Sequence, residues 1–304
     1  MKFAAFLGVK DEFELIDKAI DHLRVIGVDL VFVWDLNSRD GTLELLLARG
    51  REDAKLKVIQ GDDADFDSCS TFAAVRGAAA EAAEASYDWL LFLDADEFWL
   101  PASGRLADCA DLLEADVLSV RRFNVPLLAS RQPSDESELA FDPLHYEDVL
   151  LVVEPIPNFR DHLNAHPETP WSRGVPIPKI MARPKLIESV EMGMHDLIAR
   201  AGPPLRRATP KDLVIAHRPF TTKSRFARKI ANIRKFMTHY DEVLGPDLAW
   251  HWRRWLEIVD RDGLDEEFNR NVFDPTICAE LRQRGTIVSA AEFFRGPRAQ
   301  ETGA

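Results

Sequence analysis

Five consecutive apolar residues, Trp89 to Leu93, end at three carboxylates within four positions, Asp94, Asp96 and Glu97. A run this short and continuous is typical of a β-strand buried on both faces, as in a parallel sheet covered by helices. Asp94 then lies at the carboxyl end of the strand, where open α/β sheets bind ligands. The D-x-D pair Asp94 and Asp96 places two anions close together, and such oxygen ligands suit Mg²⁺ or Mn²⁺ bound with substrate phosphates. The segment predicts a divalent-metal site, and the plainer alternative is that Asp94 and Asp96 cap the next helix or line a solvated turn.

Strands and helices alternate through the first hundred residues. Short apolar runs predict strands at 3–9, 30–34, 57–59 and 89–93. Apolar residues at helical spacing predict helices between them, around 16–23, 43–47 and 71–85. This order builds a parallel sheet with right-handed crossovers. We therefore expect an α/β fold with a Rossmann-like, mostly parallel sheet flanked by helices.

The pattern changes after the next predicted strand, 117–120. Nine prolines between positions 126 and 178 break the chain into short pieces, so we expect only two further strands there, near 149–153 and 179–182. Regular helix should resume at Thr222, because apolar residues then recur on one face: Phe226, Ile230, Ile233, Met237 and Tyr240. These changes predict one domain over 1–217, with 117–217 as its second half, and a helical extension over 218–304.

Charge is distributed unevenly along the chain. Lys and Arg number 38 against 51 Asp and Glu, a formal net charge of −13, which excludes a general nucleic-acid binder. One stretch, 218–255, has nine basic and three acidic residues and contains Trp250, Trp252 and Trp255. Two interpretations remain open for it. It is either a helix with a solvated basic face, or a surface for donor phosphates, an anionic or lipid-linked acceptor, or peripheral contact with a membrane.

Targeting signals are not evident in this sequence. The apolar run at 3–9 is followed at once by Lys10, Asp11 and Glu12 instead of a small-residue cleavage site. No stretch reaches the roughly 18 consecutive apolar residues that a membrane span needs. The three cysteines are odd in number, widely spaced and without a metal-ligand pattern. We expect a cytoplasmic protein with reduced thiols.

Three motifs follow the first, second and fourth predicted strands. They read Val9-Lys10-Asp11-Glu12, Trp34-Asp35-Leu36-Asn37-Ser38-Arg39-Asp40-Gly41-Thr42 and Asp94-Ala95-Asp96-Glu97-Phe98. In this order they resemble the family 2 glycosyltransferases, and more narrowly their soluble bacterial branch with V-K-N-E, Y-D-N-x-S-x-D-G-T and D-A-D-E-F motifs. The resemblance covers about residues 1–240. It implies a GT-A fold, a nucleotide-diphosphate sugar as donor, Mn²⁺ or Mg²⁺, and transfer to an acceptor hydroxyl with inversion at the anomeric carbon.

The resemblance also implies a set of metal ligands. Asp96 would bind the metal directly, and Asp94 would contact the metal through water or the ribose of the donor. Glu97 would either act nearby or only hold the loop through hydrogen bonds. His195, in a G-x-H-D stretch, would complete the metal shell, and His217 is the second histidine in a position to do so. A lone histidine is otherwise an ordinary polar residue.

Further residues would bind the nucleotide. Asp35 resembles the aspartate that contacts the base or ribose, and its plainer role is to cap a turn. Lys10 and Glu12 belong to the first motif and would face the nucleotide, although Asp11 replaces the usual asparagine there. Arg76, on the helix before the metal-binding strand, would lie near the diphosphate or else be an exposed helical arginine.

Inversion requires a general base that deprotonates the acceptor hydroxyl. The sequence offers Glu147 with Asp148, an E-D pair, and Asp196 as the competitor. Each has an ordinary alternative as a solvated loop acid.

Other functions remain open at the level of sequence. The acceptor could be a saccharide, a lipid-linked molecule or a small molecule. A metal-dependent nucleotidyltransferase or phosphatase could also use a D-x-D pair, although the expected Gly-rich loop or early D-x-D motif is missing. A non-catalytic nucleotide-sugar-binding module is the alternative from another class.

Overall fold

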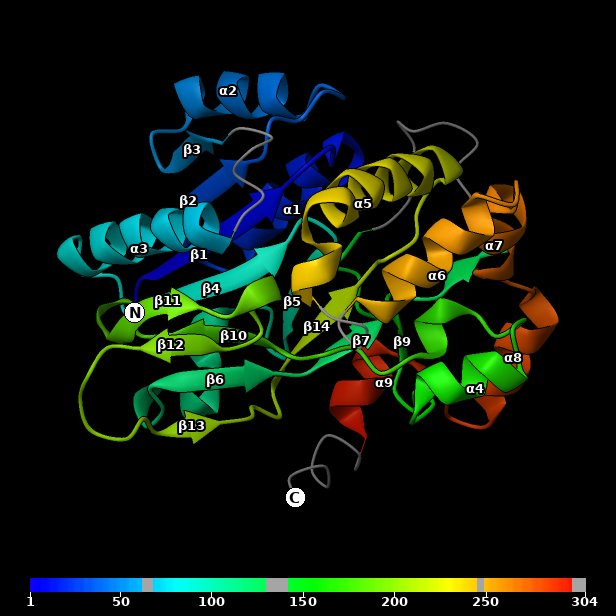
Figure 1. Cartoon of the computed structure of the whole chain (residues 1–304). Helices are drawn as coiled ribbons and strands as arrows, with labels where there is room; N and C mark the ends of the chain where they lie inside the picture. The colour runs from blue at the N-terminus through cyan, green and yellow to red at the C-terminus, as the bar shows by residue number, and fades with distance from the viewer. Residues whose placement is uncertain (62–67, 130–141, 245–248, 297–304) are drawn as a thin grey trace.

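A central sheet of seven strands organises the molecule, as the computed structural model shows (Figure 1). The structure describes residues 1–61, 68–129, 142–244 and 249–296. The strands lie in the order β13-β6-β10-β4-β1-β2-β3. Their bounds are β1 (Phe3–Val9), β2 (Val28–Asp35), β3 (Leu56–Gln60), β4 (Trp89–Asp94), β6 (Val117–Val120), β10 (Lys179–Ala182) and β13 (Arg207–Ala208). β1 to β4 are mutually parallel, whereas β10 runs antiparallel between β4 and β6.

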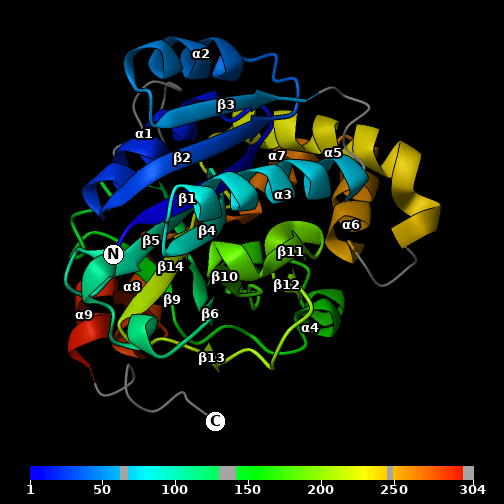
Figure 2. The ribbon, with the colours of Figure 1, turned by 90° about the vertical axis from the view of Figure 1, so that its left-hand side faces the viewer.

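Helices cover both faces of the parallel part of the sheet. They are α1 (Phe13–Val25), α2 (Thr42–Glu52) and α3 (Ser68–Glu84). Alternate residues of β1 point to opposite faces, so Leu7 packs with the apolar side chains of α1 and α2, whereas Phe6 packs with those of α3. Figure 2 shows α3 in front of β1, β2 and β4. The predicted α/β fold, with its mostly parallel sheet and flanking helices, is confirmed.

A second, three-stranded sheet begins at Glu97, three residues after the end of β4. It contains β5 (Glu97–Pro101), β14 (Leu213–His217) and β7 (Arg122–Asn124), in the order β5-β14-β7. The register pairs His217 with Glu97 on one side and with Asn124 on the other. A strand rather than a helix therefore follows the D-x-D motif, which rules out a helix-capping role for its carboxylates.

The region after residue 120 contains more strands than its prolines predicted. The two predicted strands are present, as β9 (Leu150–Val152) and β10. The additional short strands are β7, β13, β14, β8 (Leu127–Leu128), β11 (Ile187–Val190) and β12 (Leu197–Ala199). The remaining helical pieces before residue 217 are α4 (Phe159–Ala165) and the 3-10 turns η2 (Leu106–Asp108), η3 (Ala110–Leu113), η5 (Trp171–Arg173), η6 (Pro184–Leu186) and η7 (Met192–Met194). The expectation of only two strands there was wrong, because prolines beside a strand do not prevent pairing of two to five residues.

The C-terminal part is mainly helical. Its elements are α5 (Lys223–Leu244), α6 (Trp250–Val259), α7 (Leu264–Arg270), β15 (Val272–Phe273), α8 (Pro275–Gln283), β16 (Ile287–Ser289) and α9 (Ala290–Arg295). The predicted apolar stripe of α5 from Phe226 to Met237 is confirmed and packs with Trp255 and Phe268, while the side chain of Tyr240 lies outside the described residues. β16 pairs with β9 on the first part of the chain. The boundary at residue 217 remains a prediction.

Two observations bear on the environment of the chain. Within the described ranges, no helix is both long and apolar enough to cross a bilayer. Cys109 and Cys278 are free and buried. The side chain of Cys69 lies outside the described residues.

Candidate active site

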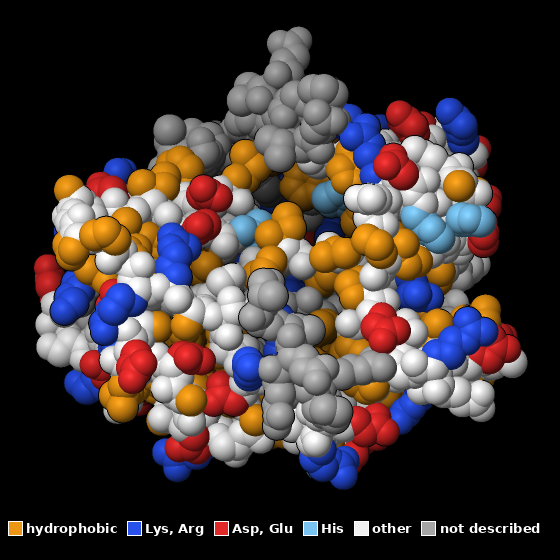
Figure 3. Space-filling view, turned by 90° about the horizontal axis from the view of Figure 1, so that it is seen from below, with side chains coloured by type: hydrophobic (Ala, Val, Ile, Leu, Met, Phe, Trp, Pro, Cys, Tyr) orange, Lys and Arg blue, Asp and Glu red, His pale blue; other side chains and the backbone are white. Residues whose placement is uncertain are grey.

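The three sequence motifs meet at one edge of the central sheet. The parallel register places the last residues of β1 beside Asp35 of β2 on one side and beside Asp94 of β4 on the other. The first turns of α5 contact this edge through ion pairs to Glu12 and Asp96. In Figure 3, the face seen from below has a hollow near its centre, with histidine and hydrophobic side chains around it.

Asp96 lies in the turn between β4 and β5 and is only 4% exposed. Its Oδ2 accepts a hydrogen bond from Arg225 Nη2 at 3.0 Å and lies 3.6 Å from Lys229 Nζ. Burial would raise the pKa of the Asp96 carboxyl, but Lys229 and Arg225 outweigh it and hold this pKa well below its usual range. Asp96 is therefore an anion. Its other oxygen, Oδ1, takes part in neither of these two contacts.

Arg225 connects the first motif to the third. Its Nε and Nη2 donate to the two carboxylate oxygens of Glu12 at 2.7 and 3.0 Å, a bidentate pair, and Nη2 also bonds Asp96. One turn further, Arg228 donates to buried Glu14 at 2.7 Å. For Arg225, Arg228 and Lys229, the interpretation of 218–255 as a solvated basic face is wrong, because these cations face carboxylates of the sheet edge.

The orientation of His217 follows from its neighbour Asn124. The Asn124 amide Nδ2 donates to the carbonyls of Ser172 and Gly174, both at 3.1 Å, so its Oδ1 faces the histidine. Oδ1 accepts from His217 Nδ1 at 2.7 Å. His217 therefore carries its proton on Nδ1 and has a lone pair on Nε2.

That lone pair faces Asp96. His217 Nε2 lies 3.7 Å from Asp96 Oδ1. Two acceptors that face each other repel unless a proton or a cation lies between them. Burial, together with Arg122, lowers the pKa of His217 well below its usual value, which disfavours the proton. The pair fits a cation.

A third carboxylate lies close to this pair. Asp96, Glu97 and His217 each offer a ligand atom within 4.8 Å of the others. This group shares Asp96 with the predicted set of Asp94, Asp96 and His195. Nitrogen and oxygen donors of this kind suit Mn²⁺ among divalent ions. The residues present therefore fit a divalent metal, with Asp96 and His217 as the ligands best placed to hold it.

Glu97 itself has fixed partners. Its Oε2 accepts from the backbone N–H of Asp94 at 3.0 Å, and its Oε1 accepts from Arg122. Lys179 Nζ lies 3.6 Å from Glu97 Oε2 and donates to Asp94 Oδ2 at 2.8 Å. Burial raises the pKa of Glu97 despite the opposing charge of Lys179. Glu97 therefore holds the D-x-D turn in place, in agreement with the loop-holding role considered from sequence.

His195 and Asp196 lie between η7 and β12. His195 Nδ1 donates to the carbonyl of Pro178 at 2.9 Å, and burial, with Lys179 nearby, lowers its pKa to about 4. Asp196 accepts from Arg207 at 2.8 Å. Lys179 connects this segment to the site, since it donates both to Asp94 and to the carbonyl of Gly193.

The predicted nucleotide-binding residues lie at the ends of β1 and β2 and on α3. Asp35 is fully buried, and its Oδ1 accepts from Ser38 N at 3.0 Å, whereas its Oδ2 has no hydrogen-bond partner among the described residues. Burial raises the pKa of Asp35. Lys10 Nζ donates to two carbonyls of the second motif, those of Leu36 at 2.5 Å and Asn37 at 3.1 Å. Arg76 is exposed on α3.

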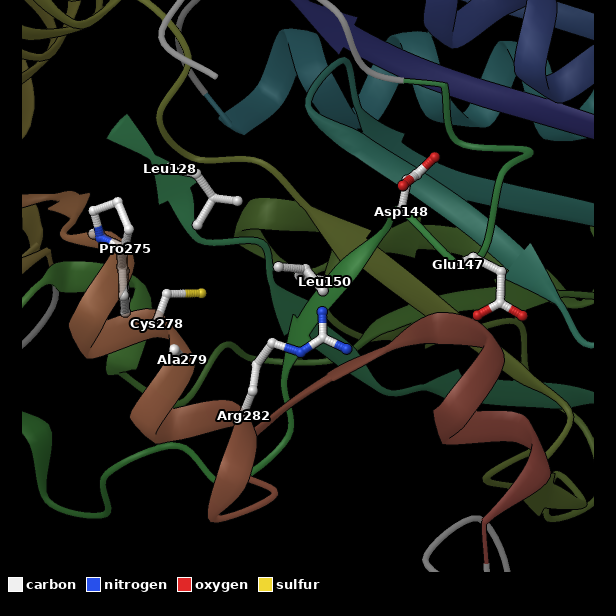
Figure 4. Close-up of a pocket in the computed structure, with 9 residues that line it drawn as sticks. Leu128, Glu147, Asp148, Leu150, Pro275, Cys278, Ala279 and Arg282 are labelled. Carbon is white, nitrogen blue, oxygen red and sulfur yellow. The ribbon is translucent and has the colours of Figure 1, made fainter. Parts of the chain in front are cut away.

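Glu147 and Asp148 lie apart from this group. The neighbouring Tyr146 bonds the carbonyl of Pro101, at the opposite end of β5 from Glu97. Four residue steps along a strand correspond to roughly 13 Å. Glu147 pairs with Arg295, and both acids line a separate cavity of about 280 Å³ (Figure 4). The structure therefore does not bring this E-D pair to Asp96.

Sequence reasoning assigned no individual role to five residues of the site, namely Arg122, Asn124, Lys179, Arg225 and Lys229. Lys179 had a detectable signal, because a lysine opens an otherwise apolar strand. Arg225 and Lys229 also had one, since residues four apart lie on the same face of a helix. Arg122 and Asn124 had none, because their three-residue strand shows no periodicity.

Of three comparisons with known proteins, only the one with solved structures finds proteins similar to this chain. No protein-family model matches the chain, and neither does any curated protein. TarS from S. aureus, solved with UDP, is 17% identical over 99% of this chain and 81% of its own, with a TM-score of 0.36. The mannosyltransferase PcManGT from Pyrobaculum calidifontis, solved with GDP-Man and Mn²⁺, is 14% identical over 93% of this chain and 79% of its own, with a TM-score of 0.37. Glucosyl-3-phosphoglycerate synthase from Mycobacterium tuberculosis, solved with phosphoglyceric acid, is 16% identical over 78% and 79%, with a TM-score of 0.32. These likenesses concern the fold.

Proposed function

We propose that this chain is a metal-dependent glycosyltransferase with a GT-A fold. It would move a sugar from a nucleotide diphosphate to an acceptor hydroxyl, with inversion at the anomeric carbon. The observation that carries the proposal is the pair of facing acceptors, Asp96 Oδ1 and His217 Nε2, 3.7 Å apart beyond the carboxyl end of β4. Such a pair calls for a cation at the edge of the sheet where α/β proteins bind nucleotides.

A metal there would serve the leaving group. Mn²⁺ or Mg²⁺ held by Asp96 and His217 would neutralise charge that develops on the nucleoside diphosphate. Asp35 Oδ2, buried and without a partner among the described residues, suits an N–H or O–H donor of the base or ribose. Glu12 and Lys10 would support the same nucleotide through the loops that they hold.

Transfer to the acceptor hydroxyl requires a general base. The general base would be Asp196, Glu147 or Asp148, and geometry favours Asp196 because Lys179 connects its segment to Asp94. Replacing the true base should lower the transfer rate by roughly 10²–10⁴-fold. Comparison of Asp196→Asn with Glu147→Gln would assign the role. A saccharide, lipid-linked or small-molecule acceptor all fit this chemistry.

Location in the cytoplasm is part of the same proposal. It is supported by the two free, buried thiols of Cys109 and Cys278. Contact of the basic C-terminal region with a membrane remains a hypothesis for residues beyond the first turns of α5.

Thermal melting tests the function directly. The chain would be melted with UDP, GDP and their sugars, each with and without Mn²⁺. A nucleotide at 100 times its dissociation constant should add about 2.7 kcal/mol to the unfolding free energy. We expect this gain to require Mn²⁺ and to disappear in Asp96→Asn, but to persist in Asp265→Asn, which alters an exposed carboxylate on α7.

Two outcomes would count against the proposed function. Folded protein that responds to no nucleotide would overturn the glycosyltransferase proposal. Binding without slow hydrolysis of any donor sugar would favour the non-catalytic binding module instead.

A further inference from the structure

Lys229 differs from the other cations of the site. It lies one turn after Arg225 on α5, so both side chains face Asp96. Its Nζ is 3.6 Å from Asp96 Oδ2, beyond hydrogen-bond distance, and within the described residues its ammonium donates no hydrogen bond. An ammonium has three donors. Lys229 therefore has hydrogen-bonding capacity to offer a ligand.

The neighbouring cations are already engaged. Arg225 is 3% exposed at its side chain and binds Glu12 and Asp96, whereas Lys179 is fully buried and binds Asp94. Arg122 is 11% exposed and binds Glu97. The side chain of Lys229 is 29% exposed. Of these four cations, Lys229 combines unused donors with access from solvent.

Lys229 and His217 lie near different oxygens of Asp96. Asp96 directs Oδ2 toward Arg225 and Lys229 and Oδ1 toward His217. A divalent ion held at Oδ1 would take up most of the Asp96 charge. The Lys229 ammonium would then have a net positive charge to present to phosphate oxygens on the same side of Asp96.

We propose that Lys229 binds the terminal phosphate of the donor diphosphate and stabilises it as the leaving group. This inference rests on the proposed function. In the transfer, the bond between the anomeric carbon and the phosphate oxygen breaks, and its electron pair remains on that oxygen. The acceptor oxygen forms the new bond to carbon and its proton passes to the base. The Lys229 ammonium donates hydrogen bonds to the oxygens where charge accumulates.

The test compares diphosphates with monophosphates. Calorimetric affinities would be measured with Mn²⁺ for UDP, GDP, UMP and GMP, on the parent, Lys229→Met and Lys229→Arg. We expect Lys229→Met to weaken binding of the preferred diphosphate by about tenfold or more and to leave the monophosphate within twofold, because only the diphosphate carries the terminal phosphate. Lys229→Arg should retain most of the affinity. Lys223→Met, on the same helix with an ion pair to Asp265, is the matched control and should change neither affinity.

The outcomes separate this inference from the function on which it rests. Equal diphosphate affinity in the parent and in Lys229→Met would overturn the role of Lys229 and leave the glycosyltransferase proposal standing. Equal losses for monophosphate and diphosphate would also overturn it, because they would show that Lys229 only supports the shape of the site. A parent that binds none of the four nucleotides would instead contradict the proposed function.

Discussion

Asp96 and Glu97 are adjacent in the chain, but their side chains belong to two different groups of charged residues. The Glu97 group contains Glu97, Asp94, Arg122 and Lys179, and both oxygens of Glu97 accept hydrogen bonds within it. The Asp96 group contains Asp96, Glu12, His217, Arg225 and Lys229. There, one oxygen of Asp96 faces a histidine lone pair. Both carboxylate oxygens of Glu97 have partners without a ligand, whereas the Asp96 group has a pair of facing acceptors and an ammonium left for one.

The side chains of Asp96 and Glu97 have different partners because β5 begins between these two residues. Glu97 is the first residue of this strand and pairs with His217 in the sheet register, so its side chain is fixed among β10 and β7. Asp96 precedes the strand and faces α5 instead. Of these two adjacent carboxylates, Glu97 therefore supports the turn, whereas Asp96 is left to bind a ligand.

The largest expected effect is on catalysis. Asp96→Asn should lower metal-dependent hydrolysis of the preferred nucleotide sugar by roughly 10³-fold, because the amide cannot hold a divalent ion as a carboxylate does. Release of the nucleoside diphosphate measures the rate, and urea unfolding confirms that the variant folds. A rate within tenfold of the parent would show that the Asp96 group is not the reacting centre.

Replacing Glu97 should mainly lower the stability of the fold. Glu97→Gln leaves Lys179 and Arg122 buried with less compensation, and breaking a buried ion pair costs about 3–5 kcal/mol of unfolding free energy. Urea denaturation measures it. Glu147→Gln is the matched control, because its exposed pair with Arg295 should contribute less than about 1 kcal/mol. Similar stability losses in both variants would remove the distinction between the two groups.

The sequence predicts where the carboxylates of the candidate site lie, but not which residues contact them. Asp35, Asp94 and Asp96 follow buried strands whose apolar runs are readable, and parallel strands bring their ends together. Lys179 reaches Asp94 because β10 inserts antiparallel between β4 and β6, a pairing that no periodicity reveals. The strands of the second sheet are three to five residues long, too short for a pattern to stand out.

His195 and His217 also show that local sequence does not reveal which residues meet in the fold. Motif position favoured His195 over His217, since a G-x-H-D stretch is easier to recognise than the last residue of a strand. In the structure His217 faces Asp96, whereas His195 bonds the carbonyl of Pro178 near Lys179. The sheet register that carries His217 to Asp96 depends on residues 120 positions apart in the chain, which local sequence does not encode.

Asn124 should affect the affinity for the metal, although it is not itself a ligand. It fixes the tautomer and orientation of His217, and loss of such a partner typically lowers metal affinity by about 10–100-fold. We expect Asn124→Ala to weaken Mn²⁺ binding by this factor, measured by titration of the ion into the nucleotide complex. Asn164→Ala, on the exposed side of α4, is the control and should have no effect. Unchanged Mn²⁺ affinity in Asn124→Ala would mean that His217 is not a ligand.

The smallest effect concerns His22, which anchors α1 to the same strand that begins at Glu97. Its Nε2 bonds the carbonyl of Trp99 at 2.6 Å, and burial lowers its pKa to about 4. The unfolded chain, with a histidine pKa of about 6.5, binds this proton first as pH falls. The stability from neutral His22 is therefore fully present above pH 6.5 and is lost as pH falls toward 4. Between pH 7 and pH 5 the loss should be about 2 kcal/mol.

Urea unfolding at several pH values checks this contribution against that of the charged groups. His22→Gln keeps a hydrogen-bond donor near Trp99 but does not titrate, so its unfolding free energy should fall by about 2 kcal/mol less than that of the parent over the same range. Burial also shifts the pKa values of His217, Glu97 and Glu12, but these residues are the same in the parent and the variant, so the difference between the two proteins isolates His22. If the variant and the parent lose stability equally, the acid sensitivity belongs to other histidines, of which His251, whose pKa burial lowers to about 3, is the next to replace.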